Sequence, residues 1–118
     1  ADHAKKAIQA GVDGIIIVSA GAGGHAGEIN PFALVREIRE FWDGPLALAG
    51  AINDGMSVRA AEILGADFSY MGTRFIATEE AEVEADYKSM LVNSQISDLI
   101  YTEYRSAAVH PAFQSNYD

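Results

Sequence analysis

Cysteine is absent from this chain of 118 residues, which excludes disulfide bonds and thiolate chemistry. Long apolar runs are absent as well: none reaches the ~20 residues needed to span a bilayer, and no secretory leader pattern is present. Basic residues are scarce, with 8 Lys and Arg against 17 Asp and Glu and a net charge of −9. A nucleic-acid surface needs clustered Lys and Arg, so we expect none here. These absences favour a cytoplasmic protein without membrane or nucleic-acid partners.

The acidic balance does not exclude a small phosphate ligand, because main-chain N–H groups at a helix start can hold one phosphate locally. The composition is that of a globular protein, with 49% hydrophobic and 21% charged residues. The sequence does not start with methionine, which suggests a processed or partial product. No spacing of His, Asp and Glu resembles a metal site, so we predict none.

Short apolar runs alternate with helical patterns along the first two thirds of the chain. The predicted strands are Gly14–Ser19, Leu46–Gly50 and Phe68–Met71. The predicted helices are Asp2–Ala10, Asn30–Phe41 and Met56–Leu64, with Asn30-Pro31 as a start signal and Gly65 as a stop signal. This alternation is typical of parallel βαβ units, and the unbroken run Gly14–Val18 indicates a strand buried on both faces.

The last third of the chain has a different character. Thr78–Asn93 is acidic at its start and predicts a helix with Tyr87, Met90 and Leu91 as its apolar contacts. Ser97–Thr102 is expected to form a further strand or an extended segment. The tail Arg105–Asp118 has no period and stays unassigned.

A glycine-rich loop, Ser19–Gly27, directly follows the first predicted strand and contains His25. Glycines let the backbone approach a ligand closely, and the carboxyl end of a strand is the catalytic face of a barrel. A pKa near 6.5 suits histidine as a general base at neutral pH. The alternative is a flexible loop with a surface histidine, and the spacing alone does not decide between them.

Two further strand ends carry small residues, at Gly50-Ala51 and at Gly72-Thr73. Two adjacent loops of this kind can direct N–H groups at one phosphate, and the Thr73 hydroxyl can add a donor. The alternative is that the two glycines only relieve crowding. Arg74 can face the phosphate or form a salt bridge.

These motifs resemble those of nitronate monooxygenases, formerly called 2-nitropropane dioxygenases. The resemblance runs from about Ala4 to Tyr104. Its motifs are Gly23-Gly24-His25-Ala26-Gly27, Leu48-Ala49-Gly50-Ala51-Ile52, Leu64-Gly65-Ala66-Asp67 and Met71-Gly72-Thr73-Arg74-Phe75. The resemblance implies the C-terminal portion of an FMN-binding (β/α)8 TIM barrel, with these strands as the sixth, seventh and eighth. A complete barrel takes roughly 250 residues, so the remaining N-terminal barrel portion is expected to be required.

The resemblance also assigns functions to individual residues. His25 corresponds to the catalytic base that takes the α-proton of a nitroalkane, and the nitronate is then oxidised with FMN and O₂ to a carbonyl compound and nitrite. The residues expected to bind FMN are Gly23 and Gly24 near the isoalloxazine, Gly50, Ala51, Gly72 and Thr73 at the phosphate, and Tyr70 and Met71 beside them.

Two residues depart from the family pattern. Many members have a glutamine where this chain has Val18, and the valine removes a side-chain hydrogen bond to the flavin. Many have glycine at Ala51, where alanine still offers its N–H group to a phosphate. We expect residues 1–78 to belong to the barrel and 79–118 to a lid or substrate region, whose divergent tail gives no substrate pocket. The oligomeric state, including a homo-oligomer, is left open by the sequence.

Two other functions remain as alternatives. The FMN-dependent enoyl-acyl-carrier-protein reductase shares the barrel and the Gly-Gly-His loop, but would need NAD(P)H and an acyl-carrier partner. The chain shows no obvious basic patch for such an acidic carrier. A non-catalytic phosphate-binding module or an inactive fragment is the third hypothesis.

Overall fold

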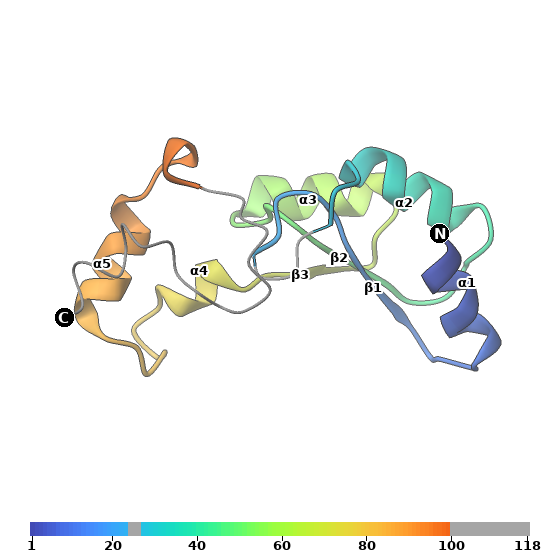
Figure 1. The fold of residues 1–118 in the computed structure, drawn as a ribbon, viewed down its shortest axis with the longest axis horizontal. Coiled ribbons are helices and arrows are strands. Elements are labelled where there is room, and N and C mark those ends of the chain that lie inside the picture. Colours follow the sequence, from blue (N-terminus) through green and yellow to red (C-terminus); the bar gives the residue numbers. More distant parts are fainter. Residues whose placement is uncertain (24–26, 100–118) are drawn as a thin grey trace. The chain divides into compact units, whose positions relative to one another are not determined.

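The computed structural model describes residues 1–23 and 27–99, and its contacts divide the chain into two units between Ala81 and Glu82. The elements of the first unit are α1 (Asp2–Gln9), β1 (Ile15–Val18), α2 (Pro31–Arg39), β2 (Leu46–Ala49), α3 (Gly55–Leu64), β3 (Phe68–Tyr70) and α4 (Thr73–Ile76) (Figure 1). The second unit contains α5 (Ala85–Asn93) and the 3-10 turn η1 (Ile96–Asp98). No helix among the described residues is long and apolar enough to cross a membrane.

The three strands form one parallel sheet in the order β1-β2-β3, which confirms the predicted βαβ units. Ile15 pairs with Leu46 and Val18 with Ala49, and Ala49 also pairs with Tyr70 of β3. Because the strands are parallel and in register, their carboxyl ends lie at one edge of the sheet. That edge brings the three predicted site loops to the same end.

The core lies between one face of the sheet and the helices α2 and α3. Its largest fully buried apolar side chains are Val35 and Ile38 of α2 and Leu46 of β2. Within this chain β1 is buried on one face only, not on both as expected: its residues alternate between buried and exposed, and Ile16 and Val18 are 57% and 40% exposed. The physical reason is that the helices cover only the face that carries Ile15 and Ile17.

Local capping explains where the helices begin and end. The Asn30 side chain accepts a hydrogen bond from Phe32 N at 2.9 Å, and Pro31 occupies the first turn of α2, as predicted. Helix α3 begins one residue before the predicted Met56 and stops at Gly65, whose φ of +117° is left-handed. Helix α1 ends at Gln9, close to the predicted Ala10.

The prediction of one helix over Thr78–Asn93 is wrong at its start, because α5 begins only at Ala85. The Thr78 hydroxyl donates to Phe75 O at 2.7 Å and closes the short helix α4, which was not predicted. Four glutamates lie between α4 and α5, and their like charges at helical spacing disfavour a helix: Glu79, Glu80, Glu82 and Glu84.

The strand predicted over Ser97–Thr102 is wrong for its first two residues. Ile96–Asp98 forms a 3-10 turn, since Asp98 Oδ2 accepts from Gln95 N at 2.7 Å and folds the chain back. Residues 100–102 lie outside the described residues, as does the unassigned tail 105–118.

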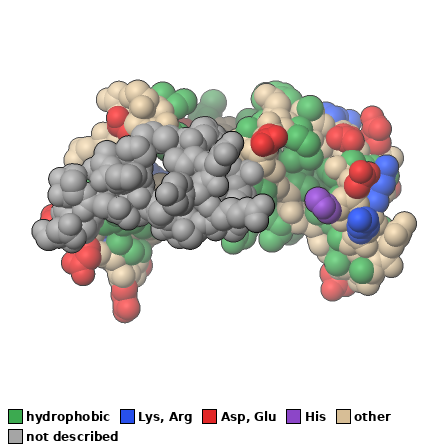
Figure 2. Space-filling view, viewed as in Figure 1, with side chains coloured by type: hydrophobic (Ala, Val, Ile, Leu, Met, Phe, Trp, Pro, Cys, Tyr) green, Lys and Arg blue, Asp and Glu red, His purple; other side chains and the backbone are tan. Residues whose placement is uncertain are grey.

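Charged side chains gather at the end of the first unit where the strands begin. On the face shown in Figure 2, Lys, Arg, Asp and Glu side chains lie over α1 and α2. Lys5 of α1 lies over the Phe41 ring, 5.1 Å from its centre, and joins α1 to the end of α2. This end of the sheet is opposite the edge that carries the predicted site.

Candidate functional site

The carboxyl ends of β1 and β2 are joined through Ser19 and Ala49. The Ser19 side chain is completely buried, and its Oγ donates to Ala49 O at 2.9 Å. The Ser19 N–H donates to the same carbonyl at 2.9 Å, which extends the ladder by one bond beyond the strand. Ser19 was not among the predicted site residues, although a polar residue at the end of an apolar strand was an available signal.

The turn after β2 has a left-handed backbone at two successive residues. Gly50 has φ of +128° and Ala51 has φ of +54°, the only positive φ of a non-glycine residue in the described part of the chain. Gly21 faces this turn with φ of +95°, and a Cβ added to it would lie 2.8 Å from the Ala51 Cβ. The β1–α2 loop and the β2–α3 turn therefore interlock through small residues.

The main-chain N–H of Ala51 donates to Gly21 O at 3.1 Å. The expectation that alanine leaves this N–H available to a phosphate is therefore wrong in this conformation. The reason is that the neighbouring loop supplies a carbonyl oxygen as its acceptor. The assignment of Ala51 to the cofactor stays a prediction, as does that of Gly50.

The glycine-rich loop is described at both of its ends. Ala20 N donates to Ile29 O at 2.8 Å and closes the base of the loop, and a Cβ added to Gly27 would overlap the Val18 carbonyl oxygen. A Cβ at Gly23 would meet no atom of the described residues within 4 Å. His25 and Gly24, the predicted base and flavin contact, lie outside the described residues.

The N-terminus of α3 is capped by the carboxylate of Asp54. Asp54 Oδ1 accepts from Ser57 N at 2.8 Å, and Ser57 Oγ accepts from Asp54 N at 3.1 Å, which completes a capping box. The Ser57 hydroxyl also donates to Asp54 Oδ1 at 2.7 Å. The hydrogen bond from the Ser57 main chain, followed by that from its hydroxyl, lowers the pKa of Asp54, and the Arg74 guanidinium also contributes. The charge of Arg74 in α4 therefore acts on Asp54 at the start of α3, but no salt bridge to Arg74 is found within the described residues.

The loop after β3 leads into a short helix whose start has free space beside it among the described residues. Gly72 precedes α4, none of the described side chains caps that helix, and a Cβ at Gly72 would meet none of their atoms within 4 Å. The first amides of a helix have no partner within it, so those of Thr73 and Arg74 are unused by α4. The Thr73 residue is exposed.

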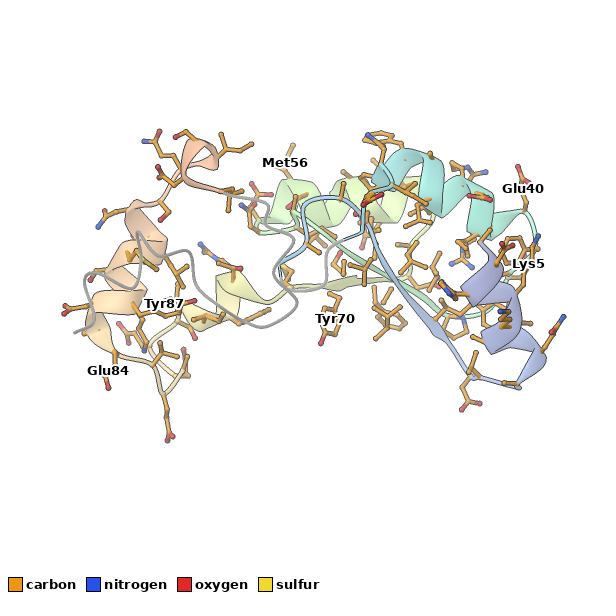
Figure 3. The ribbon with its side chains drawn as sticks, viewed as in Figure 1. Lys5, Glu40, Met56, Tyr70, Glu84 and Tyr87 are labelled. Atoms are coloured by element: carbon orange, nitrogen blue, oxygen red, sulfur yellow. The ribbon has the colours of Figure 1, made fainter. Side chains whose placement is uncertain are left out.

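The two residues before this loop point to opposite sides. Tyr70 is 58% exposed and lies on the face of the sheet opposite α3, whose Met56 points away from the sheet (Figure 3). The Met71 side chain packs against the core. Both assignments to the cofactor stay predictions.

Comparison with known proteins identifies the family. Residues 1–115 match the family profile described as nitronate monooxygenase. The chain is 33% identical over 102 residues to a nitronate monooxygenase of Paraburkholderia phytofirmans, covering 79% of this chain and 28% of that protein. It is 36% identical over 88 residues to an octahydro-indene-carboxyl-CoA dehydrogenase of Rhodococcus jostii, covering 75% of this chain and 25% of that protein.

A solved structure supports the same fold. FabK from Thermotoga maritima is similar with a TM-score of 0.79 and 37% identity, covering 84% of this chain and 32% of that one. The chain thus spans about a third or less of the length of each of these three proteins.

Proposed function

Because this chain belongs to the nitronate monooxygenase family, we propose that the full protein is an FMN-dependent oxidoreductase that converts nitronates with O₂ into carbonyl compounds and nitrite. The observation that carries the proposal is the arrangement of the three strand-end loops. They follow parallel, in-register strands, and two of them interlock through Ser19, Gly21 and Ala51. Ligands of parallel α/β folds bind at this edge of the sheet.

The three strands fit the sixth, seventh and eighth strands of a (β/α)8 barrel. The face of the sheet away from α2 and α3 carries large apolar side chains, with Ile16, Phe68 and Tyr70 each more than half exposed. In a barrel this face lines a packed interior, and further strands pair with the outer edges of β1 and β3. We propose that the remaining barrel portion supplies both the side chains that pack on this face and the strands that pair with β1 and β3.

The residues present fit the phosphate of FMN. Gly72 has open space beside it, and Thr73 offers an N–H group and a hydroxyl. The left-handed turn at Gly50 and Ala51 would form the neighbouring wall, with Tyr70 and Met71 beside it. When bound, FMN supplies the redox chemistry that transfers electrons from the nitronate to O₂.

The glycine-rich loop would carry the proton chemistry and the ring contacts. We propose His25 as the base that takes the α-proton of a nitroalkane, a step that a preformed nitronate does not need. Gly23 and Gly24 would contact the isoalloxazine ring. Val18, 40% exposed at the end of β1, offers no side-chain hydrogen bond to that ring.

The similarity to FabK supports a second candidate, the FMN-dependent enoyl-acyl-carrier-protein reductase. Measuring both activities on the full protein separates the two. The first candidate predicts O₂ uptake driven by nitronate and no NAD(P)H oxidation by an enoyl thioester. The reverse result would favour the reductase. A colourless protein that gains no flavin absorption band with added FMN would exclude both and favour a binding module or inactive fragment.

The role of His25 has its own test. His25→Asn should keep the flavin band and lose activity on neutral nitroalkanes by about 100-fold or more, a typical loss for a missing general base. Activity on preformed nitronates should fall far less. Equal losses on both substrates would show that His25 is not the base.

A further inference from the structure

Ser19 is the only fully buried polar side chain among the described residues, and no role for it follows from the family motifs. A buried hydroxyl must be hydrogen bonded, and here the acceptor is the carbonyl of Ala49, thirty residues away in sequence. The hydroxyl therefore joins the loop after β1 to the turn after β2.

The Ala49 carbonyl accepts two bonds from Ser19, one from its N–H and one from its hydroxyl, each 2.9 Å long. A peptide group is planar and trans, so a fixed carbonyl also fixes the N–H on the other side of the same peptide. The carbonyl points toward β1. The Gly50 N–H consequently points away from β1, toward the side of the turn where β3 and the Gly72-Thr73 loop lie.

The same hydroxyl determines which residue can follow Ala49. A Cβ at Gly50 would overlap Ser19 Oγ, and it would lie 3.0 Å from the carbonyl oxygens of Ser19 and Ala20. Glycine permits several backbone conformations at this position. The two hydrogen bonds from Ser19 to Ala49 O hold the Ala49–Gly50 peptide in one of them.

We propose that Ser19 is a positioning residue for phosphate recognition: it orients the Gly50-Ala51 turn that forms one wall of the FMN phosphate site. The inference rests on the proposed function, because it concerns the same cofactor. Ser19 does not touch the cofactor itself. A wall that is already oriented before binding lowers the ordering cost that the phosphate contacts must offset.

The test compares FMN with riboflavin, which differs only by lacking the phosphate. Dissociation constants of both flavins are measured by fluorescence quenching on the flavin-free full protein and on Ser19→Ala. The expected result is a preference for FMN over riboflavin that falls roughly three- to tenfold in the variant, the value of one hydrogen bond. Riboflavin affinity should change less than twofold. Ser19→Cys, with a weaker donor of similar size, should give an intermediate ratio.

Asp67→Asn, at the opposite end of the sheet, is the matched control and should leave the ratio unchanged. The inference is overturned if Ser19→Ala weakens both flavins in the same proportion, or neither, because the hydroxyl would then be merely structural. A different result concerns the proposed function: wild-type protein that binds FMN no better than riboflavin has no phosphate site, whatever the variants do. Ser19→Ala that does not fold leaves Ser19→Cys to decide, and an unchanged ratio there also overturns the inference.

Discussion

At the amino end of the sheet, the side chain of Arg39 forms hydrogen bonds to several segments of the chain. At the carboxyl end, small residues contact one another and the main chain of the neighbouring loop. Arg39 Nε donates to Gly65 O at 2.8 Å, and its Nη1 donates to Trp42 O at 3.0 Å and Gly44 O at 2.8 Å. Its Nη2 donates to Asp67 Oδ2 at 2.8 Å, and the same oxygen accepts from Leu46 N at 2.9 Å. Four segments thus meet at one side-chain pair: α2, the α2–β2 loop, β2 and the turn between α3 and β3.

Among the described residues, the carboxyl end has no such pair. Its contacts are the Ser19 hydroxyl on Ala49, the Ala51 N–H on Gly21 O and the close approach of Gly27 to Val18. Small residues leave main-chain groups accessible to a ligand, which long charged side chains would cover. The difference fits the proposed division, in which the amino end serves stability and the carboxyl end serves binding, as is usual in βα barrels.

The largest effect is expected for Gly27→Ala. The added Cβ would overlap the main chain of β1, which has no flexible side chain to move aside, so stability should fall by about 3 kcal/mol. Gly23→Ala is the matched control from the same loop, and should change stability by less than about 0.5 kcal/mol. Urea denaturation of the flavin-free full protein measures both. Equal losses would mean that the interlocked loops are not close-packed.

Arg39→Ala should have the next largest effect, on stability alone. The Arg39 side chain is 15% exposed, and its loss leaves three carbonyls without their donor, so we expect about 2 kcal/mol of destabilisation. The ratio of FMN to riboflavin affinity should not change. Arg59→Ala breaks the exposed Arg59–Glu62 pair and should cost about 0.5 kcal/mol or less. A changed flavin ratio in Arg39→Ala would break the division between the two ends.

Ala51→Gly should stabilise the carboxyl end. Left-handed φ is unfavourable for an alanine and not for glycine, so the free energy of unfolding should rise by about 1 kcal/mol. Ala22→Gly, at a residue without positive φ, should instead lower it by some tenths of a kcal/mol. Thermal unfolding of the two variants checks the opposite signs. Destabilisation by Ala51→Gly would show that the turn is not strained.

The smallest expected effect is on the pH dependence of stability. The hydrogen bond from Leu46 N, and next the Arg39 side chain, lower the pKa of Asp67 below its ordinary value of 3.8. A folded-state pKa below the unfolded one gives stability that is present above pH 3.8 and is lost as the pH falls through the folded value. Unfolding free energies at pH 5 and pH 3 should differ less in Asp67→Asn than in the wild type. An identical pH dependence would contradict this account.

The sequence pattern predicted the three strands, the caps of α2 and α3 and the order of the site loops, because each rests on neighbouring residues. Asn30-Pro31 and Gly65 act within one helical turn. Arg39 and Asp67 are 28 residues apart, and their pairing depends on the packing of α2 against the turn before β3. No local period indicates such a pair.

The site was predictable to the level of loops but not of individual bonds. Gly50-Ala51 was recognised as a strand-end turn, but the use of the Ala51 N–H by Gly21 depends on contact between two loops. The same holds for Ser19, whose importance appears only when β1 and β2 are aligned. Helix α4 was missed because four residues are too short to show a helical period.

The most direct test of the account is amide hydrogen–deuterium exchange of the full protein with and without FMN. If the carboxyl end of the sheet holds the cofactor, FMN should slow exchange in the peptides that cover Ala49–Ile52 and Met71–Arg74. Exchange around Glu40–Leu46 and Gly65–Asp67, at the amino end, should stay the same. Slowed exchange at the amino end alone, or no change at either end with FMN bound, would contradict the account.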